Sequence, residues 1–92
     1  MFENKNIRVD LWMKYPGYMV RQSSDTIRFD TDEDMVQVLT SMYKGFSDKL
    51  AELKQEFVME AASKNGDELI FLNGKFVHPK FVHFNEKLII PQ

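Results

Sequence analysis

The sequence predicts an α+β fold in which an antiparallel β-meander and a C-terminal β-hairpin region flank one long central helix. Three patterns predict it: apolar and polar residues alternate near the N-terminus, a helical apolar stripe follows, and an Asn-Gly pair separates two apolar segments near the C-terminus. Of the 92 residues, 43% are hydrophobic and 28% are charged, as in ordinary globular domains. We therefore expect one domain that spans residues 1–92.

The predicted meander occupies about residues 7–30. Every second residue from Ile7 to Tyr15 is apolar, which is the period of a half-buried strand. Pro16 followed by Gly17 suits a type II turn, because proline presets the first backbone angle and glycine accepts a positive φ. The polar "SSD" at 23–25 predicts a second turn, and "TIRFD" at 26–30 predicts a third strand.

The central helix has a start signal and a stop signal in the sequence. Thr31 is suited to cap the N-terminus, and the acidic residues 32–34 complement the positive end of the helix dipole. The "SKNG" at 63–66 offers a lysine for the last turn and an Asn-Gly pair for a left-handed C-cap. Between the two signals one apolar stripe recurs at helical spacing: Met35, Leu39, Met42, Phe46, Leu50, Leu53 and Phe57.

Gly45 lies in the middle of this stripe and allows two interpretations. Glycine costs about 1 kcal/mol in a helix interior, and Ser47 is a suitable cap for a second helix, so the chain has the signals for a helical hairpin. The stripe, however, keeps its phase across Gly45, which favours a single helix over about residues 32–63, with a bend at Gly45 as a variant.

A helix of that length predicts a homodimer. It would be about 48 Å long at 1.5 Å per residue, whereas a compact domain of this size has a radius of gyration of about 13 Å. The stripe would then extend beyond its own domain and pair with a second copy. The predicted dimer interface consists of Met42, Phe46, Leu50, Leu53 and Phe57.

The C-terminal third predicts strands over about residues 68–90. The Asn-Gly pair in "ELIFLNGKFV" is typical of a two-residue hairpin turn. Pro79 confines the following segment to a sheet edge or a bend, and "KLII" at 87–90 predicts a last short strand.

Two surface features indicate a protein partner. Asp48, Glu52, Glu56 and Glu60 are each four residues apart, so on one helix they form an acidic ridge that suits a basic partner, although solvated charge rows are also common on exposed helices. Trp12 shares the polar face of the first strand, where it serves either as an anchor for a partner or as a ring covered by a loop. The predicted partner-binding residues are Trp12, Asp48, Glu52, Glu56 and Glu60.

The segment at residues 75–87 supports an alternative partner. It interleaves lysines and histidines with phenylalanines, the combination with which proteins bind single-stranded nucleic acid, although phenylalanines on a small sheet are equally typical of a core. His78 and His83 have no ligand spacing that predicts a metal site, and no catalytic motif occurs in the chain. We expect no cofactor and no metal.

The sequence therefore predicts a small non-enzymatic protein-binding module that occupies a surface on its partner. An inhibitor of a host protein, of the kind that phages or mobile elements encode, is one such module. The alternative is a small nucleic-acid-binding regulator that uses residues 75–87. The sequence contains neither an apolar segment long enough to cross a membrane nor a signal-peptide pattern, so we expect a cytoplasmic protein.

Overall fold

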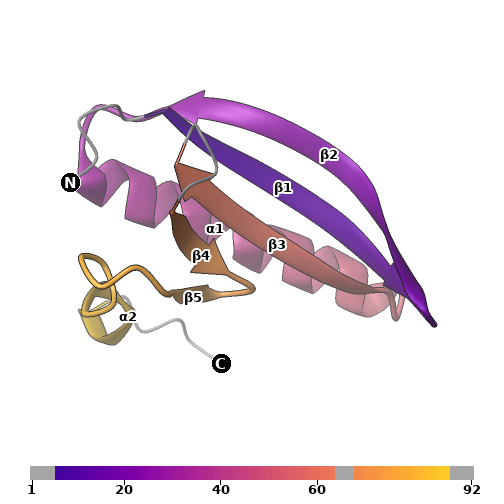
Figure 1. The fold of residues 1–92 in the computed structure, drawn as a ribbon. Helices are drawn as coiled ribbons and strands as arrows, with labels where there is room; N and C mark the ends of the chain where they lie inside the picture. The colour runs from indigo at the N-terminus through magenta and orange to yellow at the C-terminus, as the bar shows by residue number, and fades with distance from the viewer. Residues whose placement is uncertain (1–5, 64–67, 88–92) are drawn as a thin grey trace.

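The computed structural model describes residues 6–63 and 68–87, which form an antiparallel sheet with a helix on one face (Figure 1). The elements are β1 (Asn6–Tyr15), β2 (Tyr18–Arg28), α1 (Asp32–Glu52), β3 (Glu56–Ser63), β4 (Leu69–Leu72), β5 (Lys75–Phe76) and α2 (Phe84–Lys87). The five strands follow the order β2-β1-β3-β4-β5, and every neighbouring pair is antiparallel. The predicted α+β class is confirmed.

The N-terminal region is one long hairpin of two strands. The turn at Pro16 and Gly17 is confirmed, and Gly17 has the positive φ of 84° that this turn requires. The prediction of a second turn at 23–25 and of a separate third strand is wrong, because β2 continues through these residues and stays paired with β1. Its register shifts by one residue opposite Leu11 and Trp12, so Gln22 is the extra residue of a bulge and the polar residues 23–25 stay paired with β1.

Helix α1 begins where the sequence predicts. The Thr31 side-chain oxygen accepts a hydrogen bond from the backbone N–H of Asp34 at 3.0 Å. The helix also continues through Gly45, which confirms that the glycine does not separate two helices. In Figure 1 the helix runs behind the sheet along most of its length.

The predicted end of the helix is wrong, because α1 stops at Glu52 and residues 56–63 form β3 in the middle of the sheet. The Lys54 N–H donates to the Ala51 carbonyl at 3.0 Å, and the Gln55 N–H donates to the Leu50 carbonyl at 2.9 Å. These bonds form a Schellman motif whose left-handed position is occupied by Lys54, with a φ of 55°. The stop signal predicted at 63–66 falls partly on residues outside the described ranges.

A shorter helix removes the reason for expecting the stripe to pair with a second copy. At 1.5 Å per residue, its 21 residues span about 32 Å, which fits within a fold whose longest extent is 37 Å. Leu50 is buried, and Met42 and Phe46 pack against the core. Leu53 is 68% exposed, and Phe57 lies on β3 rather than on the helix. The predicted interface residues therefore do not share one helical stripe.

The core lies between α1 and the sheet. Its buried side chains come from five of the strands and helices and from the loops beside them: Ile7, Val9, Leu11, Met13, Phe29, Met35, Val36, Leu39, Leu50, Met59, Ala61, Ile70, Phe71, Phe76 and Phe81. Tyr43 of α1 contacts Phe57 and Phe71, with ring centroids 5.6 Å and 6.0 Å apart. Among the described residues, no helix is both long and apolar enough to cross a bilayer.

The Asn-Gly hairpin near the C-terminus is confirmed. Asn73 and Gly74 connect β4 to β5, and both have the positive φ that a two-residue turn of this type requires, at 48° and 102°. After Phe76 the described chain forms turns and then α2, so Pro79 lies in a bend. Of the strand predicted at 87–90, Lys87 belongs to α2 and the other three residues lie outside the described ranges.

Candidate functional site

The sheet has one face without a helix in the described part of the chain, and we call it the open face. Along β1, the side chains of Ile7, Val9, Leu11 and Met13 are buried beneath α1. The alternate side chains therefore lie on the opposite side, which faces the viewer in Figure 1. They are Arg8, Asp10, Trp12 and Lys14.

The strand registers place further side chains of the open face in rows across the sheet, because directly opposite residues of antiparallel strands share a face. Trp12 lies between Arg21 of β2 and Val58 of β3, and Asp10 lies between Ser24 and Glu60. Strand β4 adds Leu72 beside Glu60 and Leu69 beside Ala62, and these two leucines are 39% and 40% exposed. The open face thus combines an indole ring, aliphatic side chains and charges of both signs.

Trp12 is held in a fixed orientation at the centre of this face. Its Nε1–H donates to Glu60 Oε2 at 2.9 Å, and the Arg21 guanidinium lies over its ring, with Cζ 5.1 Å from the ring centroid. A cation–π contact of this kind contributes about 0.5–1 kcal/mol at an exposed site. Among the described residues Arg21 has no ion-pair partner, so its guanidinium N–H groups are available to carboxylates from outside the chain.

Asp10 is the buried charge of the open face. It is 3% exposed, its Oδ2 lies 3.3 Å from Arg8 Nε, and its Oδ1 has no hydrogen-bond partner among the residues that the structure describes. Glu60 lies directly beside it on β3, so two carboxylates are adjacent in one row. Arg8 and the Trp12 N–H each offset one of these negative charges.

The structure divides the predicted partner-binding residues between two surfaces. Trp12, Glu56 and Glu60 lie on the open face, whereas Asp48 and Glu52 lie on α1. The acidic ridge predicted along one helix is therefore wrong, because the helix ends at Glu52 before the last two acids. The hydrogen bond between Trp12 and Glu60 was not predicted, since no local sequence pattern links residues 48 positions apart.

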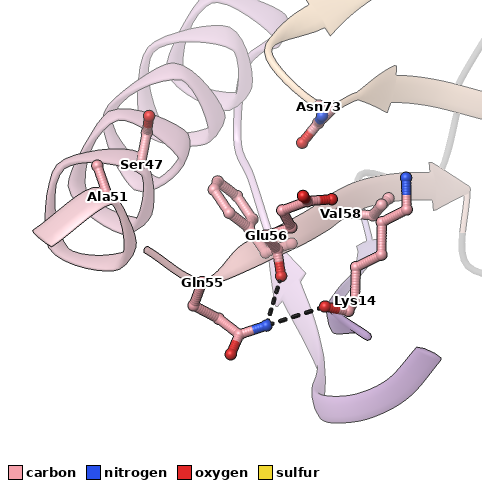
Figure 2. A pocket seen from close by; sticks show the side chains of 8 residues that line it. Lys14, Ser47, Ala51, Gln55, Glu56, Val58 and Asn73 are labelled. Atoms are coloured by element: carbon pink, nitrogen blue, oxygen red, sulfur yellow. Dashed lines mark hydrogen bonds between the residues drawn. The ribbon is translucent and has the colours of Figure 1, made fainter. Parts of the chain in front are cut away.

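An open groove of about 340 Å³ lies between the C-terminal half of α1 and β3 (Figure 2). Ser47 and Ala51 line its helix side, and Lys14 and Glu56 supply its charged groups. The Gln55 side-chain amide donates to the backbone carbonyls of Lys14 at 3.1 Å and of Glu56 at 2.8 Å, and so ties the start of β3 to the end of β1. The groove adjoins the open face at Lys14 and Glu56.

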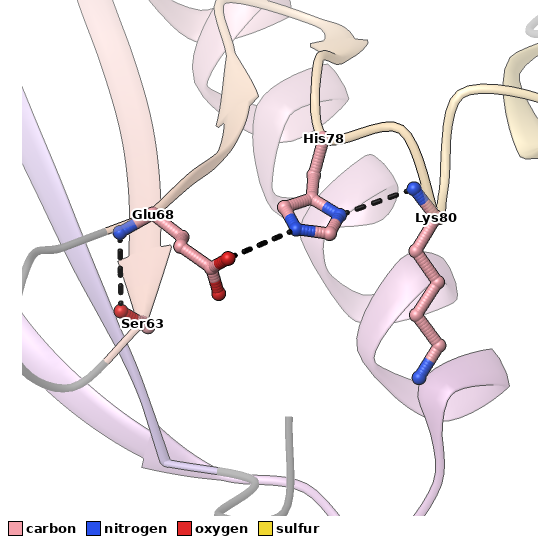
Figure 3. A network of polar contacts seen from close by, with 4 residues as sticks. All are labelled: Ser63, Glu68, His78 and Lys80. Atoms are coloured by element: carbon pink, nitrogen blue, oxygen red, sulfur yellow. Dashed lines mark hydrogen bonds and ion pairs between the residues drawn. The ribbon is translucent and has the colours of Figure 1, made fainter. Parts of the chain in front are cut away.

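The two histidines lie near the C-terminal end of the described chain. His78 Nε2 lies 3.4 Å from Glu68 Oε2, and the Lys80 backbone N–H donates to His78 Nδ1 at 3.1 Å (Figure 3). A neutral ring with its proton on Nε2 satisfies both contacts. Lys80 also pairs with Asp32 at the start of α1 at 2.9 Å, so these polar groups attach the segment to the rest of the fold. In the described ranges, no three His, Asp or Glu side chains are grouped as metal ligands.

The aromatic rings of the segment at 75–87 point largely inward. Phe76 and Phe81 are buried and Phe84 is half-buried. Nucleic-acid bases stack on rings that are exposed to solvent. The feature that supported a nucleic-acid partner is therefore part of the core and its edge.

Comparisons with known protein families, curated proteins and solved structures found no match to this chain. Its function must accordingly be inferred from the chemistry of its own surface.

Proposed function

We propose that the protein is a protein-binding module that holds its partner on the open face of its sheet. The observation that carries the proposal is the fixed Trp12 ring, clamped between Arg21 and Glu60 on a face that no described helix covers. Tryptophan and arginine are the residues most enriched among those that dominate binding energy at protein interfaces. Because Trp12 is already oriented, little conformational entropy is lost when a partner packs against it.

The composition of the open face indicates the chemistry of the partner. Arg8 is paired with Asp10, Glu60 with the Trp12 N–H, and Lys14 lies opposite Glu56. Arg21 is the charge near the centre that lacks an ion-pair partner among the described residues. A complementary protein brings one or more carboxylates to Arg21 and apolar side chains to Trp12 and Leu72.

The proposed module acts by covering a surface of its partner. Other molecules that bind to that surface of the partner are then excluded from it. The inhibitor function expected from the sequence is of this type, with the open face in the place of a helical acidic ridge. A sheet face that combines an indole ring, aliphatic side chains and charges suits a protein better than a small molecule, which binds in a concave pocket.

Charge reversal at Arg21 tests the proposal. We expect the wild-type protein, immobilised on a resin, to retain a specific partner from a lysate, and Arg21→Glu to reduce the retained amount at least tenfold as measured by quantitative mass spectrometry. The introduced carboxylate repels the acidic groups of the partner and removes the stacked guanidinium. The matched control is Lys44→Glu on α1, which makes the same charge change on another surface and should retain the partner.

A second pair of substitutions tests the sequence-based hypothesis against the structure-based one. Asp48→Lys combined with Glu52→Lys reverses the acidic residues that remain on α1. If this double variant loses the partner and Arg21→Glu retains it, the binding surface is the helix and the proposal is wrong. A wild-type protein that retains no partner specifically also contradicts it.

A further inference from the structure

Strand β2 forms one edge of the sheet and has a neighbour on one side. It is 11 residues long, and its side chains are exposed except for the half-exposed Ile27. The outer edge of such a strand carries backbone N–H and C=O groups without a strand partner. Natural edge strands are commonly protected by proline, charged side chains or bulges. Strand β2 contains no proline and no lysine, and its charged residues are Arg21, Asp25 and Arg28, beside the bulge at Gln22.

The hydrogen bonds of β3 determine which backbone groups of β2 point outward. The Met59 carbonyl accepts from Asn73 N–H at 2.7 Å, and the Ser63 N–H donates to the Glu68 carbonyl at 3.0 Å. Odd-numbered residues of β3 therefore bond toward β4 and even-numbered ones toward β1, because the direction alternates along a strand.

The same alternation extends across β1 to β2. Trp12 is opposite Val58, so the even residues of β1 bond toward β3 and the odd residues bond toward β2. Met13 is opposite Val20, and Val20 therefore points inward, whereas its neighbours Met19 and Arg21 point outward. After the bulge, the inward residues are those opposite Leu11, Val9 and Ile7, which leaves Ser24, Thr26 and Arg28 pointing outward.

We propose that β2 pairs with β2 of a second copy of this chain in antiparallel orientation, forming one continuous sheet across a twofold axis. One register satisfies the outward groups along the strand: Met19 lies opposite Thr26 of the second copy, and Arg21 lies opposite Ser24 of the second copy. The bulge makes this possible, because the outward residues have odd numbers before it and even numbers after it. A twofold axis between Gln22 and Ser23 therefore brings Met19, Arg21, Ser24 and Thr26 each opposite another outward residue, whereas Arg28 lies opposite Gly17 of the second copy, beyond the paired strands.

The side chains of β2 support a second copy as the occupant of this edge. In the proposed register Asp25 lies opposite Val20 of the second copy, so no charged residue meets a like charge. Tyr18, Met19 and Val20 are 60%, 47% and 45% exposed, and pairing covers part of their apolar surface. Tyr18 lies opposite Ile27 of the second copy, which provides an apolar contact at each end of the interface.

This dimer differs from the one that the sequence predicts, because it uses a sheet edge and leaves α1 free. Opposite residues of antiparallel strands share a face, so the open faces of the two copies become one continuous surface. The inference does not depend on the proposed function, since it rests on the backbone groups of the edge strand, whereas the proposed function rests on side chains of the open face.

Proline substitution at Met19 tests the dimer. Its N–H points outward, so Met19→Pro removes a donor from the edge while the ladder between β1 and β2 keeps its bonds, as expected for proline on an edge strand. We expect sedimentation equilibrium to give a dimer dissociation constant at least tenfold higher for Met19→Pro than for the wild type. The matched control is Met19→Ala, which shortens the same side chain and retains the N–H, and its dissociation constant should rise by less than that of Met19→Pro.

Amide hydrogen exchange of the unmodified protein provides a second measurement that requires no variant to fold. Protection of the Met19, Arg21 and Thr26 amides should rise with protein concentration, whereas protection in α1 should not change. A wild-type protein that stays monomeric at hundreds of micromolar overturns the proposal. So does a dimer that Met19→Pro leaves intact, or one that is dissociated by Leu53→Lys on the other surface.

Discussion

At the scale of single residues, Gly45 allows two interpretations. Its nearest neighbours suggest the end of one helix and the start of another, whereas the apolar stripe predicts one continuous helix. Gly45 lies inside the continuous helix α1, and beyond its two chain neighbours and the adjacent backbone of the helix itself, no described atom lies within 4 Å of a Cβ atom built at this position. No close packing and no positive φ require glycine here. Glycine at this position therefore lowers the free energy of unfolding, and no contact or backbone angle of the helix requires it.

Replacement of this glycine should stabilise the protein. We expect Gly45→Ala to raise the free energy of unfolding by about 1 kcal/mol, because alanine loses less backbone entropy than glycine when a helix forms. Urea denaturation followed by circular dichroism measures the change, and the slope of the transition should stay constant. A destabilised Gly45→Ala variant would mean that the helix needs a bend at this residue.

At the scale of the elements, the boundary between α1 and β3 is set by the Schellman motif at Lys54. Glycine is the usual residue at the left-handed position of this motif, and lysine there carries the steric cost of a positive φ. Lysine favours helix formation by propensity, so the residue at position 54 gives no signal in the sequence that the helix ends there.

The substitution Lys54→Gly distinguishes a helix that ends at Lys54 from one that continues to residue 63. The two structures predict opposite signs for the change in the free energy of unfolding. At the left-handed end of a helix, Lys54→Gly should raise the free energy of unfolding by roughly 0.5–1 kcal/mol, because the relieved steric cost exceeds the added entropy of the unfolded chain. In a helix that continued to residue 63, the same change would lower it by about 1 kcal/mol. Thermal denaturation measures the sign, and Lys49→Gly inside α1 provides the control that should be destabilised.

The segment of β3 fits two periodicities, which explains why the sequence wrongly predicts a helix there. Phe57 continues the helical stripe of α1, yet Phe57, Met59 and Ala61 also alternate along a strand that has one buried face. Residues 56–63 form a strand because β1 and β4 provide hydrogen-bond partners on both of its sides. Those partners are distant along the chain, so local propensity carries no information about them.

At the scale of the whole molecule, the helix and the C-terminal hairpin meet at Gly74. A Cβ atom at this position would lie 2.9 Å from Tyr43 Cε2, and Gly74 has a φ of 102°. Both the close approach of α1 and the backbone angle therefore require glycine. The contact joins the hairpin of β4 and β5 to the helix layer.

Alanine at Gly74 should lower the free energy of unfolding by roughly 2–4 kcal/mol, since it adds a clash with Tyr43 to the backbone strain. Gly17→Ala is the matched control: Gly17 also has a positive φ, but no atom lies within 4 Å of its Cβ position, so only the strain of about 1–2 kcal/mol applies. Chemical denaturation of both variants measures the difference. Equal losses would contradict the proposed packing of Tyr43 against the turn.

The candidate site was predicted in part. The polar face of β1 with Trp12 follows from a period of two, and the structure adds Glu56 and Glu60 to the same face from β3. Asp48 and Glu52 are separated from them by the end of α1. The clamp on Trp12 required residues from three strands, so its geometry became visible only in the assembled sheet.

The sequence by itself determined the features that depend on neighbouring residues: the alternation of β1, the turn at Pro16 and Gly17, the cap at Thr31, continuity through Gly45 and the Asn-Gly hairpin. Only the tertiary structure decided that residues 56–63 form a central strand and that β2 continues as an edge. The physical reason is that strand pairing satisfies backbone groups with partners far along the chain, whereas caps and turns satisfy them within a few residues.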